Sequence, residues 1–475
     1  MSGIDWGPAL TWALFGLYAV VTGGLAVFAG LTSNKSAASF AIGSGQMSPW
    51  VVGVTLGASL ASSATFVFYP GYVYTDGLGA LMGFSVALVA GLLTGLVLFM
   101  PRFQDVGAKV AALTVPHWLG ERYKDLGLRR IFAGLQVLNT AYLVLITVGC
   151  ARVMESTLGL PYHIALVGII AFVFGYTALG GATAHAFTNT LQGVIMLAVS
   201  VTVFLSGITL WPQAWESLQA TGWTAPQSKL FSSHWEVWLV SYLIGIALTT
   251  QPHLLAKALY VRGRRALATT IAVGITTYAT FALMLSAGAY SRVVLPEGVK
   301  TAAVVGEYIN YAFASLPLIG AIVTVAILAA SMSTLDGLLV AIAASVGNDF
   351  LPGKGKVWVN RVVLVALALA TLAISWDPPE ALVFAQVGVY AVVAASVGPL
   401  MAGLWLKGPL PRWPAWLAAI VPVVVHFALY ATVFVNPGVT ALIGMACGVP
   451  FAVLTAVVAR PNISHPDATP AGEAS

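Results

Sequence analysis

Four polar side chains stand inside one long apolar stretch of this sequence, at about 317–347. Ser331, Ser333, Thr334 and Asp336 fall within Leu328–Gly337, where a hydrophobic core would need apolar residues. An Asp at the centre of a membrane helix costs roughly 2.5–3.5 kcal/mol on insertion scales, so it usually faces a cavity and serves a function. Hydroxyls and backbone carbonyls are oxygen ligands, which a hard cation such as sodium prefers. The stretch therefore predicts a cation site, with close helix packing as the alternative for Ser333 and Thr334.

A second stretch of similar composition lies at Gly57–Gly71 and is dense in Ser and Thr. Pro70 and Gly71 predict that the membrane helix is interrupted there, because proline lacks the N–H that a continuing helix needs. An interrupted membrane helix frees backbone carbonyls that can coordinate a cation. We expect the two stretches to form one site, with a flexible seam of small residues as the alternative.

Composition indicates an integral membrane protein. The chain of 475 residues is 59% hydrophobic and 8% charged, with a mean hydropathy of +0.91. A soluble domain carries about 25% charged residues. Apolar runs of about 18 or more residues indicate helices rather than a barrel. The sequence shows no zinc-ligand spacing, nucleophile elbow or phosphate loop, so we expect neither an enzyme nor a nucleic-acid partner.

The hydropathy pattern predicts an all-α protein with about thirteen transmembrane helices. The expected spans lie near 8–30, 48–72, 77–100, 128–156, 161–178, 186–211, 236–258, 266–290, 317–347, 357–376, 380–406, 413–433 and 438–459. A short external helix is expected at 301–313, and a disordered polar tail at 461–475.

Lysine and arginine predict the orientation. With the N-terminus outside, 17 of the 21 Lys and Arg residues fall on the inner side and 4 on the outer side. Inner loops of membrane proteins carry the excess of positive charge. We therefore expect a multi-pass protein of the inner (plasma) membrane, with its N-terminus outside and its C-terminus cytoplasmic. His185 and His253 fall near inner span ends and are expected to be interfacial.

Four patterns together resemble the sodium:solute symporter family, which includes the bacterial proline permease and the sodium/glucose cotransporters. They are Thr65-Phe-Val-Phe-Tyr-Pro-Gly71 with Tyr74-Thr-Asp-Gly77, then Tyr176-Thr-Ala-Leu-Gly-Gly181 with Thr188-Asn-Thr-Leu-Gln-Gly193, then Gln251-Pro-His253, and finally Ser331-Met-Ser-Thr334. The resemblance extends over about residues 8–460. Each pattern alone is weak, but their order and spacing are specific.

The resemblance implies a leucine-transporter-like fold, with two inverted five-helix repeats in one transmembrane domain at 1–460. The repeats would be 48–211 and 236–406, with an extra helix at 8–30 and two more at 413–459. Sodium would be the coupling ion. Its site would use the main-chain carbonyls of Ala58, Ala61 and Ala330 and the hydroxyls of Ser333 and Thr334.

Two residues depart from the family pattern. The family often has an acid where this chain has Asn189, and a small or hydroxyl residue where this chain has Asp336. The family arrangement would bring both near Ser62 and Thr65. Asp336 is then a relocated ligand of a second cation site, a group that takes up protons, or a structural hydrogen-bond acceptor, and the sequence leaves all three open.

The solute site is expected at mid-membrane between the repeats. Polar and aromatic side chains of four spans are the candidates, namely Thr65, Phe66, Tyr69, Gln136, Asn139, Tyr142, Gln251, Gln386 and Tyr390. For each, bonding between helices explains the residue as well as solute contact does. Ile244 and Leu248 replace aromatic residues of the proline permease, which argues against proline. No Arg or Lys is placed to pair an anion, although hydroxyls, glutamines and sodium would still hold a monocarboxylate.

The sequence thus predicts a sodium-coupled symporter that imports a small organic solute, such as a monocarboxylate or an amino acid, by alternating access across the lipid bilayer. A monomer is expected to suffice for transport. The alternatives are a proton-coupled carrier that uses Asp336 and a membrane nutrient sensor. The short tail carries no signalling domain, which disfavours the sensor.

Overall fold

A computed structural model describes residues 6–32, 47–110, 114–351, 357–433 and 436–458, and its regular structure is helical throughout that part of the chain. The predicted tail and the extreme N-terminus lie outside the described residues, as do the side chains of 179–187. The α-helices are α1 (Trp6–Thr32), α3 (Pro49–Leu60), α4 (Tyr69–Asp76), α5 (Leu78–Met82), α6 (Leu88–Val110), α7 (Val115–Tyr123), α8 (Leu126–Leu135), α9 (Thr140–Leu158), α10 (Tyr162–Ser206), α11 (Trp211–Ala220), α12 (Ser241–Leu248), α13 (Pro252–Leu255), α14 (Arg264–Phe281), α15 (Leu285–Val294), α16 (Val304–Ala312), α17 (Pro317–Ser345), α18 (Val357–Ser375), α19 (Ala381–Trp405), α20 (Arg412–Thr432) and α21 (Pro437–Val458).

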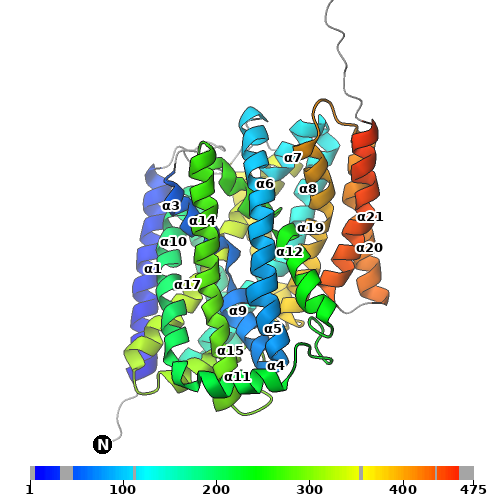
Figure 1. Cartoon of the computed structure of the whole chain (residues 1–475). Helices are drawn as coiled ribbons and strands as arrows, with labels where there is room; N and C mark the ends of the chain where they lie inside the picture. The colour runs from blue at the N-terminus through cyan, green and yellow to red at the C-terminus, as the bar shows by residue number, and fades with distance from the viewer. Residues whose placement is uncertain (1–5, 33–46, 111–113, 352–356, 434–435, 459–475) are drawn as a thin grey trace, which may run out of the picture.

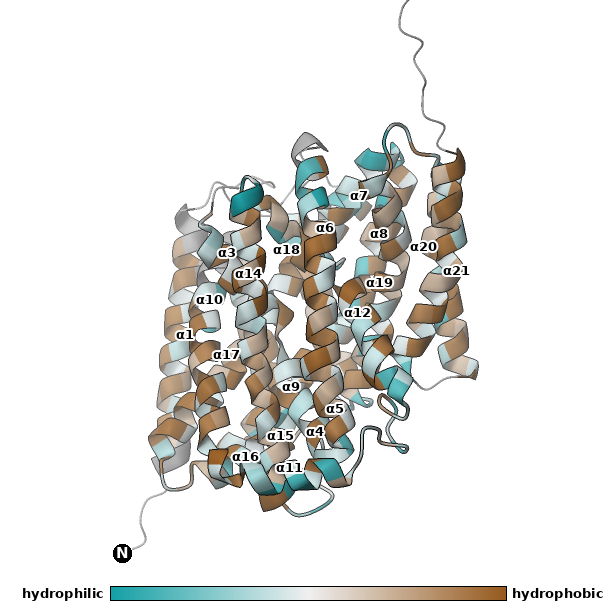
Figure 2. Ribbon diagram, viewed as in Figure 1, coloured by the Kyte–Doolittle hydropathy of each residue, from teal (hydrophilic) through white to brown (hydrophobic). Residues whose placement is uncertain are grey.

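The helices form one bundle whose long members run roughly parallel to a common axis (Figure 1). Apolar residues dominate the middle of the bundle and hydrophilic residues gather at its two ends (Figure 2). Large apolar side chains are exposed around the perimeter, for example Val20, Leu369 and Val457. Such a band would be an aggregation hazard in water but matches the hydrocarbon core of a bilayer.

All thirteen expected spans coincide with helices, but not all of these helices qualify as spans on length. In the described part of the chain, 9 helices are long and apolar enough to cross a membrane, and two bent helix pairs raise the number to 11. The expected spans at 8–30 and 161–178 coincide with the shorter apolar stretches Ala9–Leu25 and Tyr162–Ala178. The total of thirteen therefore depends on these two stretches.

The second span is broken, but not where the sequence predicted. Its two halves meet at Ala61–Ser63 with a bend of 58°, and a π-helical segment, Ala64–Phe68, follows the break. Pro70 lies in the first turn of α4, where its missing N–H costs little, so the prediction of an interruption at Pro70 and Gly71 was wrong. Gly71 serves close packing instead, because a Cβ there would lie 2.1 Å from the carbonyl oxygen of Thr301.

The connections also contain helices. The expected external helix at 301–313 is present as α16, whereas α7 and α11 occupy connections for which no helix was predicted. α10 is helical from Tyr162 to Ser206, so the connection expected between two spans there is itself helical.

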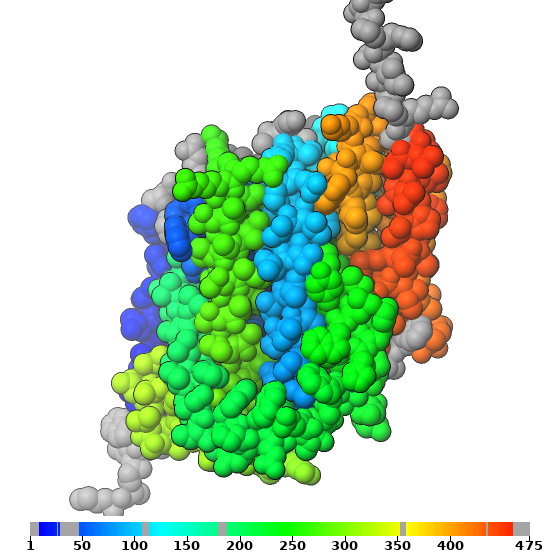
Figure 3. Space-filling view, in the orientation of Figure 1, coloured from blue at the N-terminus to red at the C-terminus, as the bar shows by residue number. Residues whose placement is uncertain are grey.

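α17 lies at the centre of the bundle, and its middle section is fully buried. It packs against α1, α9 and α10, and it also touches α3 and the π-helical segment of the second span. α14 and α6 lie side by side on the face seen in Figure 3, while α20 and α21 pack on α19 at the edge of the bundle. The polar residues of α17 are thus held against the broken second span.

Candidate functional site

Two broken spans face each other across the centre of the bundle. The seventh span, Glu236–Leu248 and Pro252–Leu259, bends by 59° at Thr249–Gln251, and the second span bends by nearly the same angle. At each break the last carbonyls of one half-helix and the first N–H groups of the next lose their regular partners. Backbone groups of this kind are the usual ion and solute ligands in discontinuous membrane helices.

A hydroxyl of α17 lies directly on the break of the second span. Thr334 Oγ1 donates a hydrogen bond to the main-chain carbonyl of Ala61. One residue earlier, Ser333 Oγ donates to the carbonyl of Ala330 at 2.6 Å. All four residues are buried. Two segments 273 positions apart in sequence therefore supply converging oxygen atoms, as the two stretches predicted.

This oxygen set fits sodium. It consists of neutral hydroxyl and carbonyl oxygens, and the residues described contain no cluster of three or more His, Cys, Asp or Glu side chains that could hold a transition metal. Hard monovalent and divalent cations take such ligands, whereas softer metals select nitrogen and sulfur. Ala58 lies one turn before Ala61 at the C-terminal end of α3, where carbonyls are left without helical partners. The five residues predicted for a sodium site are thus compatible with that role.

Asp336 is buried one turn beyond Ser333 on α17, and its carboxylate accepts hydrogen bonds from α10. Tyr176 Oη donates to Oδ2 at 3.0 Å, and Thr188 Oγ1 donates to the same oxygen at 3.2 Å. The neighbouring Asn189 donates from Nδ2 to Ser59 Oγ at 3.2 Å and to the carbonyl of Thr55 at 3.4 Å. Asp336 and Asn189 therefore sit at one junction of α3, α10 and α17.

The other two residues of the predicted second site, Ser62 and Thr65, lie just behind the lining of a central cavity. Ser62 Oγ and the Tyr142 hydroxyl share a hydrogen bond of 2.9 Å, and the N–H of Ala64 donates to Ser62 Oγ at 3.0 Å. Thr65 is buried on the π-helical segment that follows. The hydrogen-bond partners found for Ser62 thus belong to the cavity rather than to the Asp336 junction.

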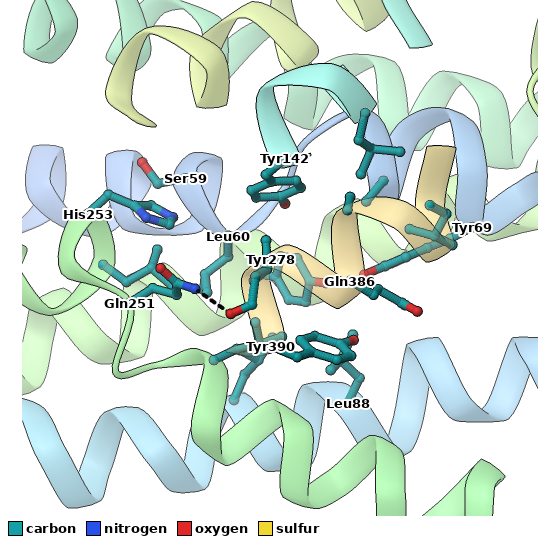
Figure 4. Close-up of a pocket in the computed structure, with 18 residues that line it drawn as sticks. Ser59, Leu60, Tyr69, Leu88, Tyr142, Gln251, His253, Tyr278, Gln386 and Tyr390 are labelled. Atoms are coloured by element: carbon teal, nitrogen blue, oxygen red, sulfur yellow. Dashed lines mark hydrogen bonds between the residues drawn. The ribbon is translucent and has the colours of Figure 1, made fainter. Parts of the chain in front are cut away.

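The central cavity lies between the second, third, fourth, seventh, eighth and eleventh spans (Figure 4). Five of the nine predicted solute residues line it, namely Tyr69, Tyr142, Gln251, Gln386 and Tyr390. The amide of Gln251 is held in place by a bond from its Nε2 to the carbonyl of Val389, 3.4 Å, drawn as the dashed line.

The remaining four predicted solute residues are not part of the lining. Phe66 packs edge-on against Phe281, and Thr65 lies behind the cavity wall. Asn139 Nδ2 donates to Gln136 Oε1 at 3.0 Å and reaches Gln251 Oε1 at 3.5 Å. Gln136 and Asn139 therefore support Gln251 from behind.

The sequence analysis missed several lining residues. His253 lines the cavity just after the break at Thr249–Gln251, and its expected interfacial position stays a prediction. Tyr278 of α14 also lines the cavity. Nothing in the sequence around this tyrosine distinguished it from one that packs between helices. Ser59, Leu60 and Ala64 border it because the break at Ala61 turns both half-helix ends toward it.

Polar contacts close the bundle at the end that carries α4 and α11. Glu380, just before α19, accepts from the Tyr72 hydroxyl at 2.6 Å and forms an ion pair with Lys229. Its hydrogen bond and its charge both raise the pKa of Lys229. Nearby, Ser228 Oγ donates to Asp76 at 2.5 Å. The loop that carries Ser228 and Lys229 is thereby tied to α4 and to the start of α19.

Loss of the contacts that Glu380 makes with Tyr72 and Lys229 should make the cavity more accessible to solvent from that end of the bundle. Glu380→Gln removes the ion pair and weakens the bond to Tyr72, which together contribute about 1 kcal/mol because Glu380 is partly exposed. We expect a roughly fivefold faster reaction of an impermeant thiol reagent with a cysteine at Ser241, which lines the adjoining vestibule, a pocket that shares Tyr69 and Tyr390 with the cavity. Glu297→Gln, an exposed acid without such contacts, is the matched control. Equal rates in both variants would show that Glu380 does not restrain the opening.

Comparisons with known proteins agree with this geometry. Residues 40–406 match the model of the sodium:solute symporter family. The sodium/proline symporter of Staphylococcus aureus is 26% identical in an alignment of 442 residues, and the match covers 84% of this chain and 84% of that one. The fold is similar to a Na+-coupled sialic acid symporter solved in a substrate-bound outward-open state, with a TM-score of 0.79, 18% identity, and coverage of 95% of this chain and 98% of that one. A nucleobase-cation-symport-1 family transporter superposes with a TM-score of 0.57 at 13% identity, over 86% of this chain and 92% of that one.

Proposed function

Because the chain belongs to the sodium:solute symporter family and is a sodium-coupled symporter of small organic solutes, we propose that it imports its solute by alternating access around the cavity of Figure 4. Sodium would bind at Ala58, Ala61, Ala330, Ser333 and Thr334. The observation that carries this assignment is the contact of Thr334 Oγ1 with the Ala61 carbonyl, which joins α17 to the break of the second span.

Sodium at that position would couple the two ligands. It would tie the broken second span to α17, and Leu60 and Ala64, on either side of Ala61, line the solute cavity. Each ligand would then favour the arrangement that binds the other, so binding would be cooperative. One sodium ion that crosses ~100 mV supplies roughly 2.3 kcal/mol. A tenfold sodium gradient adds about 1.4 kcal/mol, and the sum of about 3.7 kcal/mol would concentrate a neutral solute several hundredfold.

The repeat boundaries 48–211 and 236–406 are part of the proposal. In support, the first span of each unit is the broken one, as expected when two related halves surround one site. The helix at 8–30 and the two helices at 413–459 would lie outside the repeats. α20 and α21 pack at the edge of the bundle, which is compatible with this division.

Uptake into proteoliposomes tests the function. Accumulation of solute should require an inward sodium gradient and should stop when potassium replaces sodium. Proline is a poor candidate for that solute, because Leu248 and Ile244 line the cavity and its vestibule with aliphatic rather than aromatic surface. A proton-coupled carrier that uses Asp336 would instead accumulate solute in sodium-free buffer under a pH gradient.

The proposed orientation places the N-terminus outside and the C-terminus in the cytoplasm of a cell whose plasma membrane holds the protein. In a variant that lacks Cys150 and Cys447, a cysteine at Lys300 should react with an impermeant thiol reagent added to intact cells. A cysteine at Lys407 should react only after the cells are permeabilised. Both positions are exposed in loops, so a difference reports the side of the membrane. The reverse pattern would overturn the orientation.

A further inference from the structure

The lining of the central cavity holds tyrosines and amides in place of charged side chains. Its polar groups come chiefly from Tyr69, Tyr142, Tyr278 and Tyr390, with the amides of Gln251 and Gln386. His253 is the other titratable side chain, and the described lining contains no Asp, Glu, Lys or Arg. A cationic solute would lose its hydration here without meeting a carboxylate, which is costly.

Two carbonyls next to the break of the seventh span are already occupied. The carbonyl of Ile246 accepts from Thr249 Oγ1 at 2.6 Å and from the Thr249 N–H at 3.3 Å. The carbonyl of Ala247 accepts from Thr250 Oγ1 at 2.7 Å and from the Thr250 N–H at 3.0 Å. Both lone pairs of each oxygen are therefore used. A broken helix elsewhere could offer such carbonyls to an ammonium group, but here the chain's own threonines fill them.

Hydrogen-bond donors remain available in the cavity. Tyr390 is 8% exposed, and its hydroxyl makes no hydrogen bond to the part of the chain that the structure describes. The Tyr69 hydroxyl likewise makes no hydrogen bond to the part of the chain that the structure describes. The Gln386 amide oxygen also lacks a partner among the described residues, and this amide can present either its oxygen or its NH2 group. Tyr69 and Tyr390 therefore offer two free O–H donors to an acceptor group of the solute, and each hydroxyl can also accept.

The space is small and otherwise apolar. The cavity has a volume of about 60 Å³. One water needs roughly 10–15 Å³ measured in this way, so about four to six non-hydrogen atoms fit. Leu60, Leu88, Leu92 and Leu248 supply aliphatic walls.

We propose that the solute is a monocarboxylate of about this size, with its carboxylate on the hydroxyls of Tyr69 and Tyr390 and its short carbon chain against the leucines. The identification rests on the proposed function of this cavity. Hydrogen bonds from hydroxyls to a carboxylate are charge-assisted and roughly twice as strong as neutral ones. Sodium beyond Leu60 and Ala64 supplies the compensating charge that the lining lacks.

Thermal unfolding of the purified full-length protein tests the solute class, with probes of matched size. In saturating sodium, propionate, pyruvate and butyrate should raise the midpoint temperature, whereas propionamide, propylamine and alanine should do so weakly or not at all. In potassium buffer the effect of the acids should largely disappear. A ligand that binds only the folded state stabilises it by RT ln(1 + L/Kd), where L is the concentration of free ligand, so at one fixed concentration the probe that binds more tightly gives the larger shift.

Tyr390→Phe removes only the hydroxyl. It should raise the propionate concentration needed for a given shift of the midpoint temperature by about tenfold, because one charge-assisted bond is lost. It should not change the sodium concentration needed for a given shift in the absence of propionate. Tyr311→Phe, at an exposed tyrosine, is the control and should change neither value.

Three results would overturn the proposal: stabilisation by propionamide or alanine equal to that by propionate, no stabilisation by any of the three acids, or unchanged propionate affinity in Tyr390→Phe. Sodium-dependent stabilisation by alanine would show that the cavity accepts an ammonium group, which refutes the monocarboxylate class and leaves the symport function standing. Carboxylate binding that is the same in sodium and potassium would support the solute class and count against the sodium site.

Discussion

Thr334→Ala is expected to raise the sodium concentration for half-maximal solute uptake by at least tenfold. The variant removes an oxygen that lies on the Ala61 carbonyl and would be a direct sodium ligand. Loss of a bond between a charged group and a polar ligand costs about 1.5–3 kcal/mol, which corresponds to roughly 10- to 150-fold in affinity. Ser333→Ala should act in the same direction. Uptake assayed over a series of sodium concentrations at fixed membrane potential measures both.

The matched control is Thr324→Ala. Thr324 lies on the same helix and is as deeply buried, but it is more than two turns away from the break. Its replacement should leave sodium activation near that of the unchanged protein. Unaltered activation in both Ser333→Ala and Thr334→Ala would refute the sodium site, because two of its oxygen ligands would then be dispensable.

Asp336→Asn is the second change with a large expected effect. If the carboxylate is a ligand of a second cation, the variant should lower the number of sodium ions moved per solute and reduce concentrative uptake by about tenfold or more. Asn189→Asp combined with Asp336→Asn returns an acid to the junction of α3, α10 and α17 and should recover part of the loss. The four proteins form a double-mutant cycle, in which residues that share one site are non-additive.

Tyr176→Phe distinguishes the role of the Asp336 charge from the role of the hydrogen bond that Asp336 accepts from Tyr176. It deletes the 3.0 Å bond to Asp336 but keeps the carboxylate, so it should affect stability more than ion stoichiometry. If Asp336→Asn keeps the original stoichiometry and the double variant equals the sum of the singles, the carboxylate is structural. If Asp336→Asn instead abolishes the pH dependence of uptake and leaves sodium activation intact, the residue takes up protons.

The presence and approximate position of each expected span were determined by sequence, although the ends expected at 178 and 186 lie inside the continuous helix α10. Apolar length, flanking polar residues and the period of hydropathy are local properties, and each expected span coincides with a helix of the structure. The pairing of the two Ser- and Thr-rich stretches was also predictable, because polar groups at bilayer depth need partners that only another such segment supplies.

The position of the break in the second span was decided by tertiary packing. Proline gives a strong local signal, yet Pro70 lies in a helical first turn and the chain bends at Ala61–Ser63 instead. There, no residue type forbids a helix; the hydroxyl of Thr334, from a distant helix, meets the carbonyl that the break leaves free. A contact between residues so far apart in sequence does not change the helix propensity of the residues around the break, so local sequence could not predict it.

Only some of the residues that line the cavity could be predicted from the sequence. Tyr69, Tyr142, Gln251, Gln386 and Tyr390 stood out as polar or aromatic residues in apolar spans, and they do line it. Gln136 and Asn139 looked equally suitable but support Gln251 from behind, whereas Tyr278 and His253 lie in the wall. Composition reveals that a polar residue is buried in a membrane protein. Only the rotation and bending of its helix decide whether it faces a cavity, a neighbouring helix or an ion.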